Sequence, residues 1–164
     1  MSVFVLVVSI VAAVVVLGGL FLVATANRLD RLHVRLDAGW AALDAALARR
    51  AVVARAVAAV DGAAPGLREA ADIAEKAPRA EREVAENELT RLLASIDRSR
   101  LPAELAGELA DAEHRVVIAR RVHNDAVRDT LALRRRRKVR YFKLAGTARQ
   151  PEYFEIAEPP VPGA

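Results

Sequence analysis

The stretch NRLDRLHVRLDAGWAALDAALARR, residues 27 to 50, has its apolar side chains three and four residues apart. The same spacing continues to residue 58 and defines one stripe, made of Leu29, Leu32, Leu36, Trp40, Leu43, Leu47, Ala51, Ala54 and Ala58. A stripe of this period predicts an amphipathic α-helix with one buried face. Gly and Pro in DGAAPG, residues 61 to 66, predict where that helix ends.

The composition favours an all-α protein. Ala, Leu, Arg and Glu are strong helix formers, and the β-branched residues concentrate in the first 23 positions. The chain has 164 residues, the length of one domain, and no Cys. A disulfide framework and a thiolate metal site are therefore excluded.

Residues 3 to 26 contain no charged side chain. This apolar segment is longer than the roughly 20 residues that cross a bilayer as a helix, which predicts a transmembrane anchor. A cleaved signal peptide is the alternative, but it needs a basic n-region and an apolar core of about 7 to 15 residues. Arg28, Arg31 and Arg35 follow the segment and no Lys or Arg precedes it, so the bulk is predicted to be cytoplasmic, on the inner (plasma) membrane.

Two further helical regions are expected after the first. The region 66 to 98 contains Pro78, which breaks or kinks a helix. The region 102 to 138 is a second long rod with an apolar stripe. Three rods of similar length with short turns predict an up-and-down antiparallel four-helix bundle, the middle rod being broken near Pro78. The expected organisation is an anchor at 3–26, one helical domain at 27–156 and a disordered tail at 157–164.

His123 lies on the apolar stripe of the last region, within the triplet His123 to Asp125. A catalytic histidine needs a nucleophile or a substrate pocket within hydrogen-bonding reach, and no serine lies on this predicted helix. We therefore predict that His123 is a packed, hydrogen-bonded structural residue of the helix seam, and that Trp40 is a structural residue of the same seam. No catalytic residue is predicted.

Asp30 with His33, and Asp111 with His114, repeat the carboxylate-x-x-His spacing by which helix bundles hold metal ions. Asp111 and His114 each follow a stripe position by two residues, which turns them about 200° from the core at 3.6 residues per turn. No metal site and no cofactor are therefore predicted.

Asp37 and Asp44 flank Trp40 at the edge of the first stripe. Carboxylates at such an edge are expected to pair with Arg115 or Arg120 of the last rod, because partly buried carboxylates require partners. Such pairs would determine the register of the helices more than their stability. A polar groove for a binding partner is the alternative.

The segment RRRRKVRYFK, residues 134 to 143, concentrates positive charge at the end of the last rod. Its predicted partner-docking residues are Arg134, Arg135, Arg136, Arg137, Lys138, Arg140 and Lys143. Three interpretations remain open: a solvated helix end facing the acidic region 62–113, a docking site for an acidic protein, or a site for nucleic-acid phosphates. Further on, PEYFEI, residues 151 to 156, predicts that Tyr153 and Phe154 fold back onto the bundle, with a linear partner motif as the alternative.

Several separated blocks together resemble the LemA family. They are residues 27–50, AENEL at 85–89, EHRVVIARRVHNDAV at 113–127 and YFE at 153–155. The resemblance implies a bacterial protein with one N-terminal anchor and a cytoplasmic four-helix bundle, without an established biochemical activity. The chain departs from the family pattern at His123, where a Tyr is expected, at AVVARAV, 51–57, and at the basic run 134–138.

These observations predict a membrane-anchored adaptor or scaffold for an unidentified protein partner, and not an enzyme. A membrane-tethered binder of nucleic acid through residues 134–143 is the alternative, and a metal-dependent enzyme is a third class. A homo-oligomer through the anchor is left open by its small residues, although no GxxxG is present: Ser9, Ala13, Gly18 and Gly19.

Overall fold

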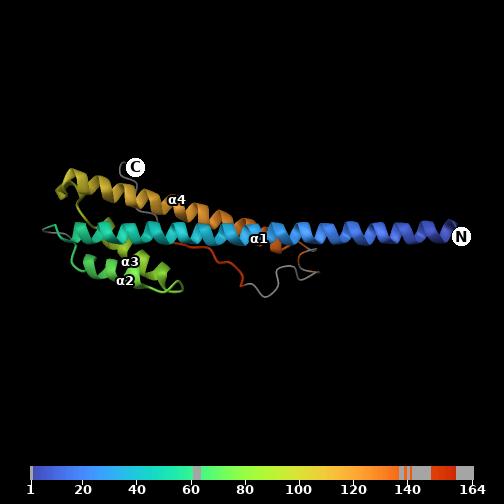
Figure 1. Ribbon diagram of the computed structural model, residues 1–164. Helices are drawn as coiled ribbons and strands as arrows, with labels where there is room; N and C mark the ends of the chain where they lie inside the picture. Colours follow the sequence, from blue (N-terminus) through green and yellow to red (C-terminus); the bar gives the residue numbers. More distant parts are fainter. Residues whose placement is uncertain (1, 61–63, 137–138, 140, 142–148, 158–164) are drawn as a thin grey trace. The chain divides into compact units, whose positions relative to one another are not determined.

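The computed structural model describes residues 2–60, 64–136, 139, 141 and 149–157. Its elements in chain order are α1 (Ser2–Ala58), α2 (Leu67–Lys76), α3 (Arg82–Ala94), the 3-10 turn η1 (Arg98–Arg100) and α4 (Ala103–Arg134) (Figure 1). No strand occurs among the described residues, which agrees with the predicted all-α class. Contacts divide the chain into two compact units, Met1–Asp37 with Ala126–Pro151, and Ala38–Asp125 with Glu152–Ala164.

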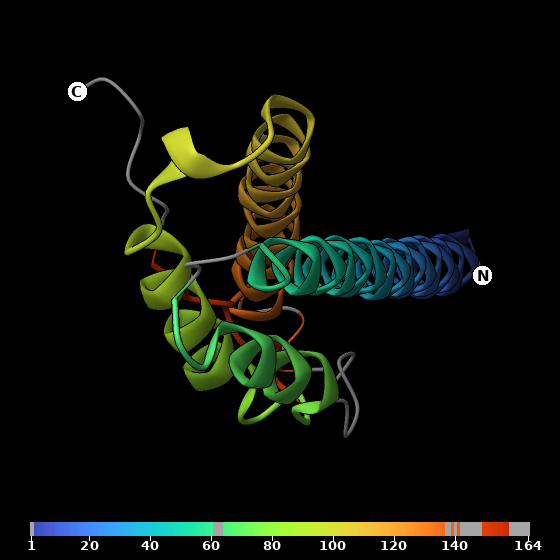
Figure 2. The ribbon, with the colours of Figure 1, turned by 90° about the vertical axis from the view of Figure 1, so that its left-hand side faces the viewer.

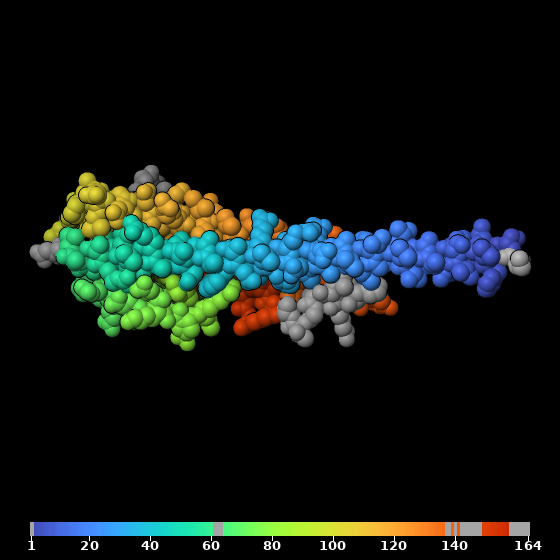
Figure 3. All heavy atoms as spheres, viewed as in Figure 1, coloured from blue at the N-terminus to red at the C-terminus, as the bar shows by residue number. Residues whose placement is uncertain are grey.

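The N-terminal part of α1 is the predicted apolar segment. Among the described residues, α1 is the one helix long and apolar enough to cross a membrane, with a mean hydropathy of 3.0 over its most apolar window. No residue of that window is buried, and its side chains are exposed along the helix (Figure 3). As the absence of a helix breaker between Ala26 and Leu29 predicts, α1 runs from the apolar segment into the amphipathic one without interruption.

The second unit contains the larger apolar core, to which all four of its α-helices contribute. Its buried members are Ala51, Val53, Ala54 and Val57 of α1, Leu67, Ala70, Ala71 and Ala74 of α2, Leu89 and Leu93 of α3, Leu101, and Leu109 and Ala112 of α4. Within this unit α2 and α3 lie side by side (Figure 2). Burial of each Leu or Val side chain stabilises the fold by about 1.5–3 kcal/mol, so this cluster is the main apolar contribution to folding.

The middle region is broken where Pro78 predicts. α2 ends at Lys76 and α3 begins at Arg82. Ala77, the residue before the proline, is extended with φ −60° and ψ 132°, because the proline ring disfavours a helical conformation there. Gly66 precedes α2 with φ 81°, a left-handed conformation that glycine adopts without strain.

The last helix is shorter than predicted. α4 ends at Arg134, four residues before the predicted end at residue 138. The Arg136 N–H donates to the Leu133 carbonyl at 3.1 Å, three residues back, as in the tightened last turn of many helices. The helix ends where consecutive arginines begin, and like charges on neighbouring turns destabilise a helix. In the first unit, Leu133 packs with Leu29, Leu32 and Val139.

Candidate functional site

Trp40 and His123 meet where α1 and α4 come into backbone contact. A Cβ added to Gly39 would lie 3.3 Å from the His123 Cα, so the absence of a side chain permits this approach. His123 is fully buried, and its ring meets Trp40 edge to face with centroids 5.6 Å apart. Phe154 packs on Trp40 in the same way at 5.7 Å, and the Arg79 guanidinium lies 3.8 Å from the centre of the indole. His123 and Trp40 therefore occupy packed seam positions.

The surroundings of His123 favour its neutral form. Burial lowers the pKa of His123, and the nearby charge of Arg79 lowers the pKa further. Hydrogen bonding with the Glu152 backbone raises the pKa and offsets part of this shift. Among the described residues, no side chain forms a hydrogen bond with either ring nitrogen of His123. The Glu152 backbone is the hydrogen-bonding group that acts on the ring, and packing on Trp40 holds the ring in place.

Residues 152–157, called the tail segment below, form neither helix nor strand and pack on the second unit. Phe154 and Ile156 are buried with Leu43, Leu47 and Val116, while Glu155 and Ala157 between and after them are exposed. This alternation is the period of two that an extended chain imposes on its side chains. The predicted return of Phe154 to the helices is confirmed. Tyr153, one residue earlier in the alternation, faces away from this cluster and is 45% exposed.

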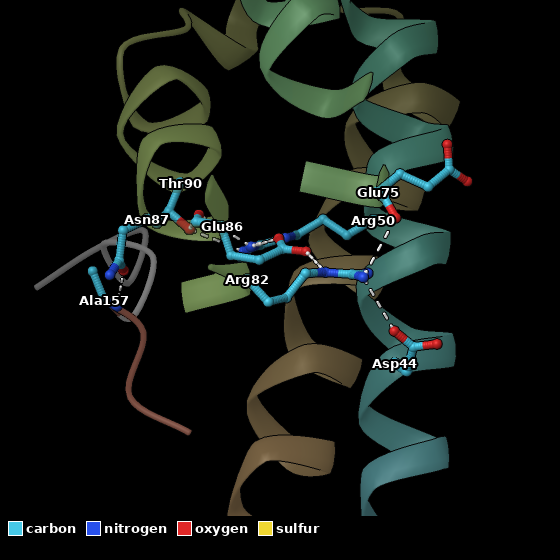
Figure 4. A network of polar contacts seen from close by, with 8 residues as sticks. All are labelled: Asp44, Arg50, Glu75, Arg82, Glu86, Asn87, Thr90 and Ala157. Atoms are coloured by element: carbon cyan, nitrogen blue, oxygen red, sulfur yellow. Dashed lines mark hydrogen bonds and ion pairs between the residues drawn. The ribbon is translucent and has the colours of Figure 1, made fainter. Parts of the chain in front are cut away.

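Side chains from α3 and α4 hold the backbone of this tail. Asn124 Nδ2 donates to the Phe154 carbonyl at 3.1 Å, and the Phe154 N–H donates to Asn124 Oδ1 at 2.9 Å. The Glu155 N–H donates to Glu83 at 2.8 Å. The Ala157 N–H donates to Asn87 Oδ1 at 2.7 Å (Figure 4). Ala157 is the first residue of the predicted disordered tail, 157–164, and this hydrogen bond holds it on α3. Residues 158–164 of that predicted tail lie outside the described residues.

A buried ion network joins α1 to α3 (Figure 4). Arg50 Nη2 lies 2.6 Å from Glu86 Oε2, and its Nη1 donates to Thr90 Oγ1 at 3.1 Å. Arg82 Nε donates to the other Glu86 oxygen at 3.0 Å, and its Nη1 lies 3.3 Å from Asp44. Arg50 and Glu86 are 1% and 0% exposed, so the pair is removed from water.

The charges of this network balance. Arg50 and Arg82 carry two positive charges, and Glu86 and Asp44 carry two negative ones. Buried charges are tolerated when they are paired and hydrogen-bonded, and such pairs specify an arrangement more than they stabilise it. The four-residue spacing of Arg82 and Glu86 is the sequence signal for this network. Arg50 and Glu86 lie in two of the blocks that resemble the LemA family, 27–50 and 85–89.

The predicted register pairs have different partners. Asp44 pairs with Arg82 of α3, and Arg120 lies 3.9 Å from Glu155 of the tail. Asp37 and Asp44 are both exposed, as is Arg115, and the expected partial burial of the two carboxylates is wrong. Each aspartate follows a stripe residue by one position, and this 100° rotation carries it out of the seam.

Little of the predicted basic docking segment falls within the described residues. Arg135 and Arg136 are exposed, and Arg134 Nη1 donates to the Arg149 carbonyl at 3.1 Å. Arg137, Lys138, Arg140 and Lys143 lie outside the described residues. The use of this segment for docking remains a prediction.

The two carboxylate-x-x-His pairs do not converge on a metal site in the described part of the chain. Asp111 and His114 are exposed, as the rotation from the seam predicts. Asp30 is exposed and His33 is half-buried in the first unit. Among the described residues, no group of three or more His, Asp or Glu side chains is placed to hold an ion.

An apolar groove between α2 and α3, called the α2–α3 groove, lies on another surface of the second unit. Its large apolar members, Ile73 and Val84, are 55% and 75% exposed. Charged side chains line it as well, four of them acidic and two basic: Glu69, Asp72, Glu81, Glu88, Arg68 and Lys76. A concave apolar surface with a mainly acidic border suits a partner with an apolar ridge and basic flanks.

No protein-family model matches this chain, and no curated protein and no solved structure matches it either. Three features of the molecule bear on its function: the apolar span of α1, the α2–α3 groove and the bound tail segment.

Proposed function

We propose that this chain is a single-pass membrane protein of LemA type whose cytoplasmic helical bundle serves as an adaptor for protein partners. The apolar part of α1 is the anchor, and the second unit presents the docking surfaces. No catalytic step is assigned to it.

The anchor is supported by hydropathy and by charge. Exposed apolar side chains over a whole helical span are compatible with lipid and costly in water. Arg28, Arg31 and Arg35 follow the span directly, and the excess of positive charge on that side favours the cytoplasm for the remaining chain.

An antiparallel four-helix bundle is supported by the shared core. α1, α2, α3 and α4 all bury residues in one cluster, and short connections join successive helices. Helices joined by short connections pack as antiparallel neighbours. The LemA resemblance agrees with this arrangement through residues 27–50, 85–89, 113–127 and 153–155.

The observation that carries the adaptor function is the α2–α3 groove. Ile73 and Val84 expose most of their apolar surface in one groove, and a contiguous apolar surface with a polar border is typical of protein-binding sites. We propose that a partner fills it with an apolar helix ridge whose basic side chains face Glu69, Glu81 and Asp72.

The test is purification of the chain from gently solubilised membranes, followed by quantitative mass spectrometry. The parent is compared with Ile73→Asp/Val84→Asp and with Val52→Asp, a control at an apolar position that is 45% exposed on α1 and does not line the groove. We expect a partner that is retained by the parent and by Val52→Asp and is lost from the double variant. Equal recovery of every protein by all three chains would contradict docking in this groove.

A further variant addresses the basic segment. With Arg134 to Lys138 replaced by Gln, a protein partner lost from that variant alone would move the docking site to this segment. Nuclease treatment of the same samples distinguishes the alternative, because a recovered complex that depends on nucleic acid would be lost on digestion.

Topology is tested by single cysteines, since the chain has none of its own. Ser95→Cys in intact cells should resist a membrane-impermeant thiol reagent and react after the membrane is opened. Labelling from outside would contradict the cytoplasmic orientation.

A further inference from the structure

The end of α4 lies beside the base of the apolar span in the first unit. Leu133 is buried with Leu29, and Leu32 packs against the same cluster (Figure 1). Arg35 of α1 pairs with Asp129 of α4 at 3.6 Å, so later residues of α4 meet earlier residues of α1. The last turns of α4 therefore run back toward the apolar span.

With the apolar span in a bilayer, the end of α4 reaches the level of the lipid headgroups. The span ends at Ala26, and Leu29 lies about 5 Å further along α1 at about 1.5 Å per residue. The headgroup region extends about 5–7 Å beyond the hydrocarbon on each side. Arg135 and Arg136 follow Leu133 directly, in the tightened last turn. They lie within about one Debye length of the headgroups, roughly 8 Å at physiological salt, so their charge is only partly screened there.

The first unit carries an excess of positive charge. Its described residues include eight arginines and three aspartates, a net charge of plus five. Four of the arginines are exposed and form no ion pair among the described residues, and they are called the juxtamembrane arginines below: Arg28, Arg31, Arg135 and Arg136. Clusters of about four to eight Lys or Arg directly beside a transmembrane helix on the cytoplasmic side are typical of binding sites for anionic lipids.

An exposed tyrosine accompanies these arginines. Val139 is buried with Leu29 and Leu133, and Tyr141, two residues later, is 82% exposed. Tyrosine is enriched where a membrane meets water, because its ring is apolar and its hydroxyl is polar. Tyr141 is therefore a second indication of a membrane-facing surface, and it does not depend on charge.

We infer that the juxtamembrane arginines form a site for the headgroups of anionic phospholipids in the cytoplasmic leaflet. The inference rests on the proposed membrane anchor. A guanidinium presents a planar set of N–H donors that binds a phosphate through two hydrogen bonds, and two helices supply such groups at one depth. Nucleic acid would have to approach an anionic leaflet to reach the same side chains, and like charges repel, so lipid is the favoured ligand.

Photo-cross-linking to lipids tests the site in bilayers. The full chain is reconstituted in nanodiscs of phosphatidylcholine and phosphatidylglycerol in equal amounts, and one of the two lipids carries a photoactivatable group next to its headgroup. The measured quantity is the yield of cross-linked phosphatidylglycerol relative to cross-linked phosphatidylcholine. The parent is compared with Arg135→Gln/Arg136→Gln and with Arg135→Lys/Arg136→Lys, which keeps the charge. The matched control, Arg100→Gln/Arg115→Gln, removes the same charge from exposed positions of the second unit.

We expect the parent to cross-link phosphatidylglycerol in preference to phosphatidylcholine, and the preference to fall as salt is raised. The attraction of an anionic leaflet for one basic residue near its surface corresponds to about a fivefold enrichment. Arg135→Gln/Arg136→Gln should therefore lower the ratio by about fivefold or more. The lysine variant and the Arg100→Gln/Arg115→Gln control should keep the ratio of the parent, and circular dichroism should show the same helix content in all four chains.

An unchanged ratio in Arg135→Gln/Arg136→Gln overturns the inference, and so does an equal loss in the Arg100→Gln/Arg115→Gln control. A nuclease-sensitive complex, or an acidic protein, that binds the parent and not Arg135→Gln/Arg136→Gln while the lipid ratio stays the same would assign these arginines to that ligand instead. Retention of the full chain in nanodiscs of phosphatidylcholine alone reports the anchor separately. A chain that stays in these bilayers without a lipid preference would lose the lipid site and leave the proposed function standing.

Discussion

Glu86→Leu should strongly destabilise the second unit, because it removes the shared acceptor of two buried arginines. Arg50 lies 2.6 Å from one carboxylate oxygen and Arg82 lies 3.0 Å from the other. Arg50 is 1% exposed and Arg82 is 6% exposed, so neither guanidinium can be solvated without opening the fold. Removing one partner of a buried pair costs about 3–5 kcal/mol, against the roughly 5–15 kcal/mol that typically stabilise a native protein.

Urea unfolding in mild detergent, followed by circular dichroism, measures this change. Trp40, the one tryptophan of the chain, provides a second signal from within the unit. The matched control is Glu88→Leu on the same helix. Glu88 and Arg91 form an ion pair with both side chains at least half exposed, and ion pairs in contact with solvent add little to stability.

A triple variant separates the loss of pairing from the loss of volume. Arg50→Met, Arg82→Met and Glu86→Leu together remove every buried charge of the network, while Asp44 stays half exposed to solvent. Replacement of a whole buried ion network by apolar residues is often neutral or stabilising. A Glu86→Leu loss below about 1 kcal/mol, or a triple variant as unstable as the single one, would refute the reasoning.

Three further predictions concern the seam and the tail. Folding lowers the pKa of His123, so the unfolded chain binds more protons than the folded one at mildly acidic pH. The free energy of unfolding should therefore fall as the pH drops below about 6.5, the usual pKa of a histidine. Unfolding midpoints measured at pH 7.5 and 5.5 should differ less in His123→Gln than in the parent. Gly39→Ala should be less stable than Gly107→Ala by about 1–3 kcal/mol. Both variants gain about 0.5–1 kcal/mol from the better helix former, but only the Cβ at position 39 meets the His123 backbone, and Gly107 has no atom within 4 Å; thermal melts of both variants check this. Asn124→Ala should lower the free energy of unfolding by about 1–3 kcal/mol, because it removes both hydrogen bonds to Phe154. It should also make residues 152–157 more sensitive to protease than Glu155→Ala does. Equal digestion of the two variants would contradict the role of Asn124.

Local patterns in the sequence predicted the helical elements well. The three-four spacing identified the buried faces of α1 and α4, including His123, because side chains at that spacing lie on one side of a helix whatever the helix packs against. Pro78 predicted the break between α2 and α3 because its effect acts on its own backbone and on the residue before it. The apolar span of α1 could be predicted from composition and length alone.

The partners of the polar side chains could be identified only from the tertiary structure. The stripe did not show that Arg50 reaches Glu86, that Asp44 pairs with Arg82, or that Asn124 binds the tail. A rotation of one residue turns a helical side chain by 100°, so the choice of partner depends on how each helix is rotated and placed against its neighbours. The sequence by itself determined which faces leave water, through the period of its apolar residues. Only the packed helices decided which charges meet across those faces, because that choice depends on distances between segments far apart in the chain.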